Sequence, residues 1–123
     1  MLLLLVDDSE ASLQVLKDVV EDRGHTVVGL ARDGLEAVAK YQDLHPQAVF
    51  LDVIMPRMNG LDALAAIRQL DPQARVVMVS SMQSPETALA ARQAGAMYFL
   101  NKPFDLPVVH KVLDLLAQAI AQQ

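Results

Sequence analysis

Short apolar runs recur along the chain, and acidic, serine or glycine residues bound them. The runs span residues 2–6, 26–31, 48–51, 76–79 and 98–100. Most of them lack the polar alternation of a strand with one face in water, which is typical of strands covered on both sides. The pattern therefore predicts five strands in a parallel sheet.

Between these runs, hydrophobic residues recur at the three- and four-residue spacing of amphipathic helices. The last segment carries the longest stripe, through Val109, Leu113, Leu116 and Ile120. Earlier stripes run through Leu13, Leu16 and Val20, through Leu35, Val38 and Ala39, and through Leu61, Leu64 and Ile67, and an alanine-rich segment with Leu89 follows Ser84 and Pro85. Each predicted strand is therefore followed by a predicted helix.

Capping residues support these limits. Asp33 and Asp105 can cap helices through their carboxylates, and Ser84 precedes a proline suited to the first helical position. Gly24 and Gly95 lie where helices should end. The order βαβαβαβαβα implies right-handed crossovers, and hence an α/β fold with a doubly wound sheet.

The size of the chain suits one compact domain. With 123 residues, of which 53% are hydrophobic and 20% charged, it can bury a sizeable core. We expect a single domain over residues 1–123 with no output domain, because capping residues occur near both ends. A fragment of a larger α/β domain is the alternative.

The net charge of −5 argues against nucleic-acid binding by the chain alone, because it repels phosphate backbones. It fits a protein that collects a divalent cation or meets a basic partner. The absence of cysteine excludes disulfides, thiolate nucleophiles and cysteine zinc sites. The first apolar run lacks a basic start and meets Asp7 and Asp8, so it is too short for export or a membrane span. We expect a cytoplasmic protein without membrane insertion.

Polar residues follow four of the predicted strands, at the edge where doubly wound folds bind ligands. Asp7 and Asp8 follow the first strand, and Asp52 follows the third. Ser80 follows the fourth strand, and Lys102 lies just beyond the fifth. The fold therefore predicts that these side chains converge at one rim.

This set of side chains matches the needs of phosphoryl transfer. Carboxylates at close range repel one another, and a divalent cation removes that cost. Ligands that offer only oxygen favour Mg²⁺, which keeps room for phosphate oxygens. Lys102 supplies a positive charge, Ser80 a hydrogen bond, and the Asp52 carboxylate a nucleophile.

Each of these residues also has an ordinary structural interpretation. Asp8 and Ser9 can cap the first helix, and Asp52 can cap a turn. Ser80 can be a hydroxyl at a strand end, and Lys102 a solvated charge. The placement of the whole set on one side of the sheet favours a site.

Longer motifs contain these residues. They are Val6-Asp7-Asp8-Ser9, Asp33-Gly34-Leu35-Glu36-Ala37, the run LDVIMPRMNG at 51–60, Val79-Ser80-Ser81 and the segment 95–104, which ends in Lys102-Pro103-Phe104. Over its whole length the chain resembles the receiver domain of two-component response regulators, including the stand-alone chemotaxis type. The resemblance implies a flavodoxin-like (βα)5 fold, with a five-stranded parallel sheet in the order 2-1-3-4-5.

The resemblance also implies roles for the rim residues. Asp52 would be phosphorylated by a sensor histidine kinase. Asp7, Asp8, Asp52 and the backbone carbonyl of Ile54 would hold Mg²⁺. Ser80 would move to meet the phosphoryl group.

Further implied features surround Lys102. Its ammonium would pair with the acidic site at rest and with phosphate when activated, and the Lys102-Pro103 bond would be cis. Phe99 stands at the position of the family's switch aromatic, where many members carry tyrosine. Because Phe99 lacks the hydroxyl, it should favour a buried position, and Tyr98 should point to the opposite face of its strand.

Two positions modulate phosphate lifetime in the family, and Ile54 and Met82 occupy them here. Both side chains are apolar and cannot orient an attacking water. We expect slow self-dephosphorylation.

The resemblance implies protein partners. The donor would be a sensor histidine kinase, a phosphotransfer protein or a small acyl phosphate, and it would dock near Ala11, Ser12 and the loop at Met55 and Pro56. The signal would pass to a downstream protein through the face of the fourth helix, fifth strand and fifth helix. A monomer is expected, with a phosphorylation-dependent dimer as the alternative.

Two other functions compete with this one. One is a receiver-like module that binds partners without phosphorylation. The other is a phosphohydrolase with an aspartate nucleophile, but such enzymes usually carry a second aspartate two residues after the first, whereas Asp7 and Asp8 are adjacent. We therefore expect no enzyme activity beyond self-phosphorylation from small donors and self-dephosphorylation.

Overall fold

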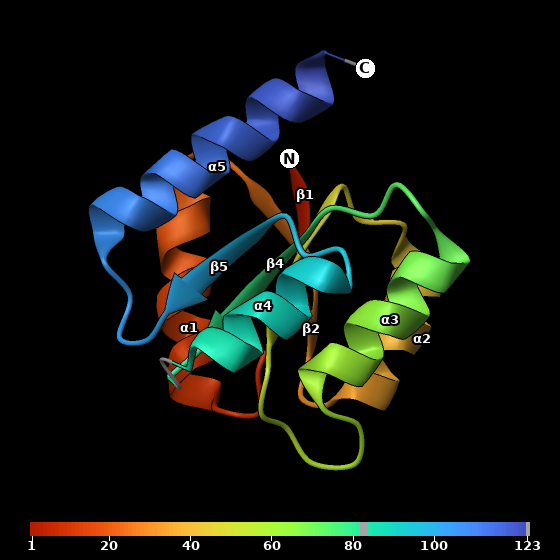
Figure 1. Cartoon of the computed structure of the whole chain (residues 1–123). Coiled ribbons are helices and arrows are strands. Elements are labelled where there is room, and N and C mark those ends of the chain that lie inside the picture. Colours follow the sequence, from red (N-terminus) through yellow and green to blue (C-terminus); the bar gives the residue numbers. More distant parts are fainter. Residues whose placement is uncertain (82–83, 123) are drawn as a thin grey trace.

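A computed structural model describes residues 1–81 and 84–122 of the chain. Within these residues, five strands alternate with five helices, as the hydrophobic pattern predicted (Figure 1). The strands are β1 (Leu2–Val6), β2 (Thr26–Ala31), β3 (Ala48–Asp52), β4 (Val76–Ser80) and β5 (Tyr98–Asn101). The helices are α1 (Glu10–Asp22), α2 (Gly34–Leu44), α3 (Gly60–Leu70), α4 (Pro85–Gln93) and α5 (Leu106–Ala121).

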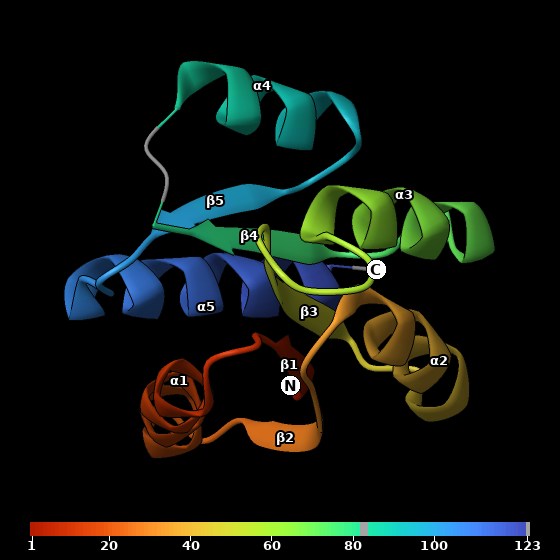
Figure 2. The ribbon, with the colours of Figure 1, turned by 90° about the horizontal axis from the view of Figure 1, so that it is seen from below.

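The strands form one parallel sheet in the order β2-β1-β3-β4-β5. Helices α1 and α5 cover one face, and α2, α3 and α4 cover the other (Figure 2). Both the doubly wound class and the strand order predicted from the sequence are confirmed. In the part of the chain that the structure describes, no helix combines the length and apolarity needed to cross a membrane.

Burial on both faces of the sheet explains the continuous apolar runs. Leu3 and Leu5 of β1 pack in the core beneath α1 and α5, while Leu4 and Val6 pack in the core on the opposite face. Every residue of β3 and β4 is buried. Tyr98 and Phe99 pack against different cores, so they point to opposite faces of β5 as predicted.

Three strands run one residue further than the sequence predicted. Asp52 ends β3, Ser80 ends β4 and Asn101 ends β5. The ladder continues because backbone pairing does not require an apolar side chain, and Asp52 is paired with Val79 and Ser80 with Asn101. The sheet therefore fixes the backbone of both Asp52 and Ser80.

Most predicted helix ends are confirmed. The side chains of Asp33 and Ser84 accept hydrogen bonds from backbone N–H groups in the first turns of α2 and α4. Gly24 and Gly95 follow α1 and α4 with φ angles of 85° and 104°. The Lys102–Pro103 peptide bond is cis, as expected.

The predicted cap of α5 is only partly correct. Asp105 occupies the N-cap position, but its side chain makes no capping hydrogen bond within the described residues. Proline in the first turn of α5 removes one of the N–H groups that a capping carboxylate normally binds.

Gly60 lets α3 begin directly against the end of β3. Its N–H donates to the carbonyl of Val53 at 2.7 Å. A Cβ atom at Gly60 would lie 2.0 Å from the carbonyl oxygen of Asp52, which no packed structure tolerates. The absence of a side chain at Gly60 therefore sets the path of the chain immediately after Asp52.

We predict that Gly60→Ala lowers the free energy of unfolding by about 3 kcal/mol, because backbone must move to admit the methyl group. Gly24→Ala is the matched control, since a Cβ there meets nothing within 4 Å and only the positive φ opposes it. That control should cost about 1 kcal/mol. Urea unfolding of both variants measures the difference, and equal losses would contradict the steric explanation.

Candidate functional site

Three carboxylates meet at the carboxyl ends of β1 and β3. Asp7 and Asp8 directly follow β1, and Asp52 is the last residue of β3. One oxygen of each lies within 4.8 Å of the others. Asp7 and Asp52 are each only 5% exposed, whereas Asp8 is exposed. The convergence predicted from the strand ends is therefore found.

The loop after β1 is held by its own hydrogen bonds. The N–H of Asp7 donates to the carbonyl of Ala31, and one carboxylate oxygen of Asp7 accepts from the N–H of Ser9. The N-cap of α1 is Ser9, whose hydroxyl accepts from the N–H of Ser12. Of the two residues that could cap α1, Ser9 therefore does so and Asp8 does not.

Lys102 reaches this cluster from the end of β5. Its Nζ forms an ion pair with Asp7 and lies 3.4 Å from Oδ2 of Asp52. Its backbone N–H donates to the carbonyl of Ser80 at 2.9 Å, which ties the start of the β5–α5 loop to β4. The ammonium therefore bridges the two buried carboxylates.

Burial and repulsion act together on Asp52. Burial raises the pKa of Asp52, the charge of Asp7 raises it further and Lys102 lowers it in part, so that the pKa is about 6. Burial alone would lower the pKa of Lys102, but Asp7 and Asp52 outweigh it and raise that pKa. The cluster thus retains more negative charge than Lys102 neutralises.

This donor set fits Mg²⁺. The cluster offers closely spaced carboxylate oxygens without nitrogen or sulfur ligands, as hard divalent cations prefer. The exposed Asp8 lies on the solvent side, where a metal ion that keeps several waters can be accommodated.

Ser80 and Ile54 flank Asp52. Ser80 ends β4, the strand beside β3, and is only 1% exposed. Ile54 lies two residues after Asp52, with its side chain 53% exposed, so its backbone can face the cluster while its side chain meets solvent. Met82, the other predicted lifetime position, lies outside the described residues.

Phe99 is half-buried, which corrects the expectation of a buried position. It lines a cleft of about 290 Å³ between α4 and β5, together with Ala88, Ala91 and Arg92. The small alanine side chains of α4 leave this space open, so the ring is not fully covered.

A second cleft, of about 440 Å³, lies between α1 and the β5–α5 loop and includes Lys102. It contains the predicted docking residues Ala11 and Ser12. Val15, Pro103, Phe104 and Leu106 also line it. Val15 and Leu106 were not predicted from the sequence as docking residues. Both lie outside the apolar stripes of their helices, which is the signal that could have identified them as exposed hydrophobic residues.

The loop after Asp52 departs from the docking prediction. Pro56 is exposed, but Met55 is only 8% exposed and packs in the core beneath α2 and α3. An apolar side chain next to a sheet end finds a place in that core, so Met55 is not a surface residue.

Comparisons with known proteins agree with this geometry. A family model described as the response regulator receiver domain matches residues 3–114. The chain is 40% identical over 111 residues to the chemotaxis protein CheY of Thermotoga maritima, covering 90% of this chain and 92% of that protein. It is 41% identical over 116 residues to CheY of Listeria monocytogenes, covering 94% of this chain and 98% of the relative.

Solved structures show the same likeness. A complex of CheX with CheY, BeF3 and Mg²⁺ from Borrelia burgdorferi matches with a TM-score of 0.89 and 32% identity, covering 94% of this chain and 88% of that one. The response regulator domain of Thermotoga maritima CheB matches with a TM-score of 0.86 and 36% identity, covering 98% of this chain and 96% of that one.

We predict that Asp52→Asn stabilises the protein in EDTA at neutral pH, by on the order of 1 kcal/mol, because the variant lacks a carboxylate whose ionisation the fold opposes. Below pH 3.8 the carboxyl is protonated in both the folded and unfolded states and contributes nothing. Between pH 3.8 and about 6 the unfolded state ionises first, so the wild-type protein loses stability relative to the variant. Urea unfolding across this range measures the difference, and a variant less stable than the wild type at neutral pH would contradict it.

Proposed function

Because this chain belongs to the response regulator receiver family and is of the CheY type, we propose that Asp52 accepts a phosphoryl group from a histidine kinase. The observation that carries this proposal is the position of the Asp52 carboxylate. It ends a central strand, is nearly buried beside Asp7, and is paired with Lys102. Burial, and after it the charge of Asp7, raises the pKa of Asp52 to about 6. A divalent cation at the site would offset both this repulsion and the charge of a transferring phosphoryl group.

Asp7, Asp8 and Asp52 would hold Mg²⁺, with the backbone carbonyl of Ile54 as a further ligand. The ion would neutralise the phosphoryl oxygens during transfer. The solved complex of the Borrelia burgdorferi relative contains BeF3 and Mg²⁺, which supports this choice of metal for the present chain.

The protein side chains supply the nucleophile and part of the charge stabilisation. A carboxylate oxygen of Asp52 attacks phosphorus, and the P–N bond of a phosphohistidine, or the P–O bond of an acyl phosphate, breaks. The departing imidazole takes a proton from solvent. Lys102, already bridging Asp7 and Asp52, can turn to a phosphoryl oxygen, and Ser80 can donate its hydroxyl to another.

The phosphodonor protein would dock in the cleft between α1 and the β5–α5 loop. Lys102 lies in its lining, so a partner seated there comes directly beside the acidic cluster. Ala11, Phe104 and Leu106 provide an apolar lining around a charged centre, as transient interfaces often do.

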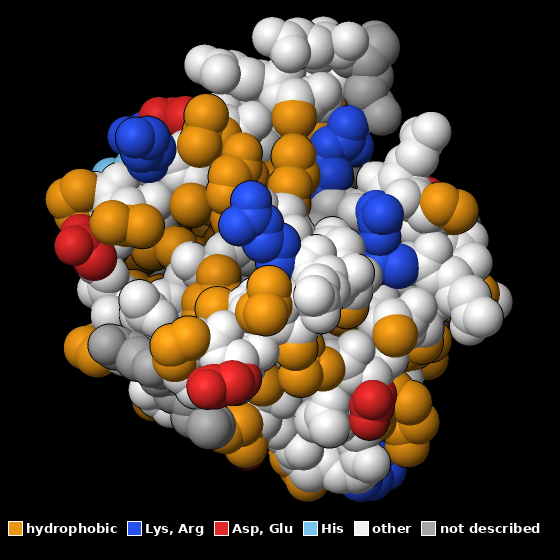
Figure 3. All heavy atoms as spheres, viewed as in Figure 1, with side chains coloured by type: hydrophobic (Ala, Val, Ile, Leu, Met, Phe, Trp, Pro, Cys, Tyr) orange, Lys and Arg blue, Asp and Glu red, His pale blue; other side chains and the backbone are white. Residues whose placement is uncertain are grey.

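The signal would leave through the face of α4, β5 and α5. Figure 3 shows hydrophobic side chains gathered over these elements, with lysine or arginine side chains among them. Leu89, Met97 and Val108 contribute exposed hydrophobic surface. Movement of Ser80 towards a phosphoryl group would let Phe99 pack further against the sheet and close the cleft between α4 and β5. The equilibrium between the open and closed conformations of this face would then shift towards the one that a protein partner recognises.

We predict that acetyl phosphate with Mg²⁺ adds one phosphoryl group to the wild-type protein and none to Asp52→Asn, measured by intact-protein mass spectrometry. Asp43→Asn, which changes an exposed carboxylate on α2, is the matched control and should be phosphorylated normally. Lys102→Ala should slow the reaction by about a hundredfold, because a positioned positive charge is lost. Equal phosphorylation of Asp52→Asn would exclude Asp52 as the acceptor, and no phosphorylation of any protein would favour a module that only binds partners.

We predict that Ile54→Asn shortens the lifetime of the phosphorylated form severalfold, because an amide at this exposed position can orient an attacking water. Ile54→Ala is the control, since it removes the apolar cover without adding a polar group. The phosphoryl half-life follows from the decay of the phosphorylated mass after removal of the donor. The same acceleration in both variants would mean that the amide does not orient water.

A further inference from the structure

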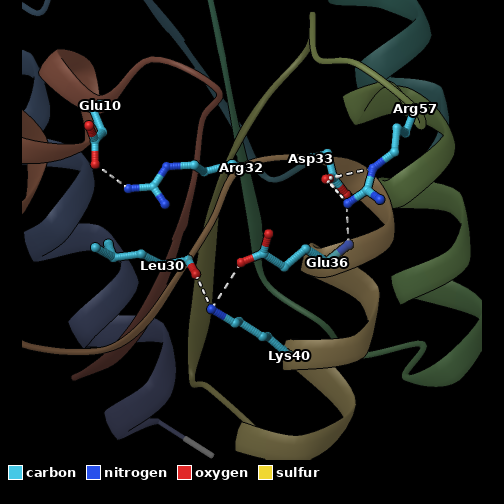
Figure 4. A network of polar contacts seen from close by, with 7 residues as sticks. All are labelled: Glu10, Leu30, Arg32, Asp33, Glu36, Lys40 and Arg57. Atoms are coloured by element: carbon cyan, nitrogen blue, oxygen red, sulfur yellow. Dashed lines mark hydrogen bonds and ion pairs between the residues drawn. The ribbon is translucent and has the colours of Figure 1, made fainter.

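Arg57 lies in the loop that joins Asp52 to α3 and makes a two-donor contact with a buried carboxylate of another loop. Its Nε donates to Oδ2 of Asp33 at 3.0 Å, and one terminal nitrogen donates to the same oxygen (Figure 4). The Asp33 side chain is 7% exposed, whereas that of Arg57 is 63% exposed. Charged hydrogen bonds to a buried partner are stronger than ordinary surface ion pairs.

The other oxygen of Asp33 is also occupied. Oδ1 accepts from the N–H of Glu36 at 2.8 Å and so caps α2. This backbone bond, followed by the contact with Arg57, lowers the pKa of Asp33, which keeps the carboxylate charged. Asp33 therefore joins the start of α2 to the loop after β3.

A second contact anchors the same loop. The N–H of Gly34 donates to the carbonyl of Met58 at 2.9 Å, and a Cβ at Gly34 would lie 2.4 Å from that oxygen. Arg57 itself has a φ of 65°, which is uncommon for a residue with a side chain and needs support from its surroundings. The contact with Asp33 supplies that support three residues beyond Ile54.

We propose that Arg57 is a positioning residue for the metal site, acting through Asp33 on the loop that carries the Ile54 carbonyl. This inference rests on the proposed function, in which that carbonyl is a metal ligand. The Ile54 side chain is half exposed and gives its own backbone little packing, whereas Val53 and Met55 on either side of it are buried in the core. The contact between Arg57 and Asp33 adds a further anchor where the loop leaves Met55. Groups that orient metal ligands from outside the ligand set commonly change metal affinity tenfold or more.

The test compares Mg²⁺ dissociation constants of the full chain, measured by NMR titration well below the unfolding temperature. Arg57→Ala should raise the constant about tenfold. Asp33→Asn, which keeps an oxygen for the cap of α2 but loses the charge, should do the same, and the double variant should show no further rise. Arg57→Lys should give an intermediate value, since lysine keeps the charge without the paired donors.

Arg32→Ala is the matched control. Arg32 is a neighbouring half-exposed arginine that pairs with Glu10 at the start of α1 and does not reach the β3–α3 loop (Figure 4). The Mg²⁺ dissociation constant of Arg32→Ala should equal that of the wild-type protein. Urea unfolding in EDTA accompanies each titration.

An unchanged dissociation constant in Arg57→Ala, with a lower urea midpoint, would reduce the contact to a structural role and overturn the proposal. An equal rise in Arg32→Ala would also overturn it, because the effect would then not depend on the contact between Arg57 and Asp33. Failure of the wild-type protein to bind Mg²⁺ would overturn the proposed metal site together with this inference. Wild-type binding with an unchanged Arg57→Ala constant would overturn the positioning role alone.

Discussion

The ammonium of Lys102 brings one positive charge to a cluster of three carboxylates, and this imbalance governs the site. Asp7 and Asp52 are almost completely buried, so neither can be screened well by water. Burial and mutual repulsion raise the pKa of Asp52 to about 6 even with Lys102 present. A bound divalent cation would relieve this excess of negative charge, and it would also offset the charge that a phosphoryl group adds to the site.

The parallel sheet makes this imbalance possible because it brings the ends of β1, β3 and β5 to one edge. The loops then need accurate placement, and small residues provide it by close backbone approach. Gly60 lies against the carbonyl of Asp52, and Gly34 against that of Met58. The contact between Arg57 and Asp33 adds a charged tie at the edge of the site. The path of the loop after β3 thus depends on residues whose side chains are not part of the carboxylate cluster.

The sequence predicts the sheet and the rim well because both follow from local patterns. Continuous apolar runs indicate buried strands, and the strand ends alone place Asp7, Asp52 and Lys102 together. The sequence fails to predict features that depend on a residue far away in the chain. The half-buried state of Phe99 depends on small side chains in α4, and the contact of Arg57 depends on a carboxylate 24 residues away. Neither dependence leaves a periodic signal in the chain.

The central claim is that Asp52 is the phosphoryl acceptor and that Lys102 and Mg²⁺ offset the charge around it. A crystal structure of this protein with Mg²⁺ and beryllofluoride tests it most directly. We expect beryllium bonded to a carboxylate oxygen of Asp52, Mg²⁺ held by Asp7, Asp8 and Asp52, and the Lys102 ammonium turned to a fluoride. Beryllofluoride bound elsewhere, or an Asp52 carboxylate that stays paired with Lys102 in the presence of both ligands, would contradict the claim.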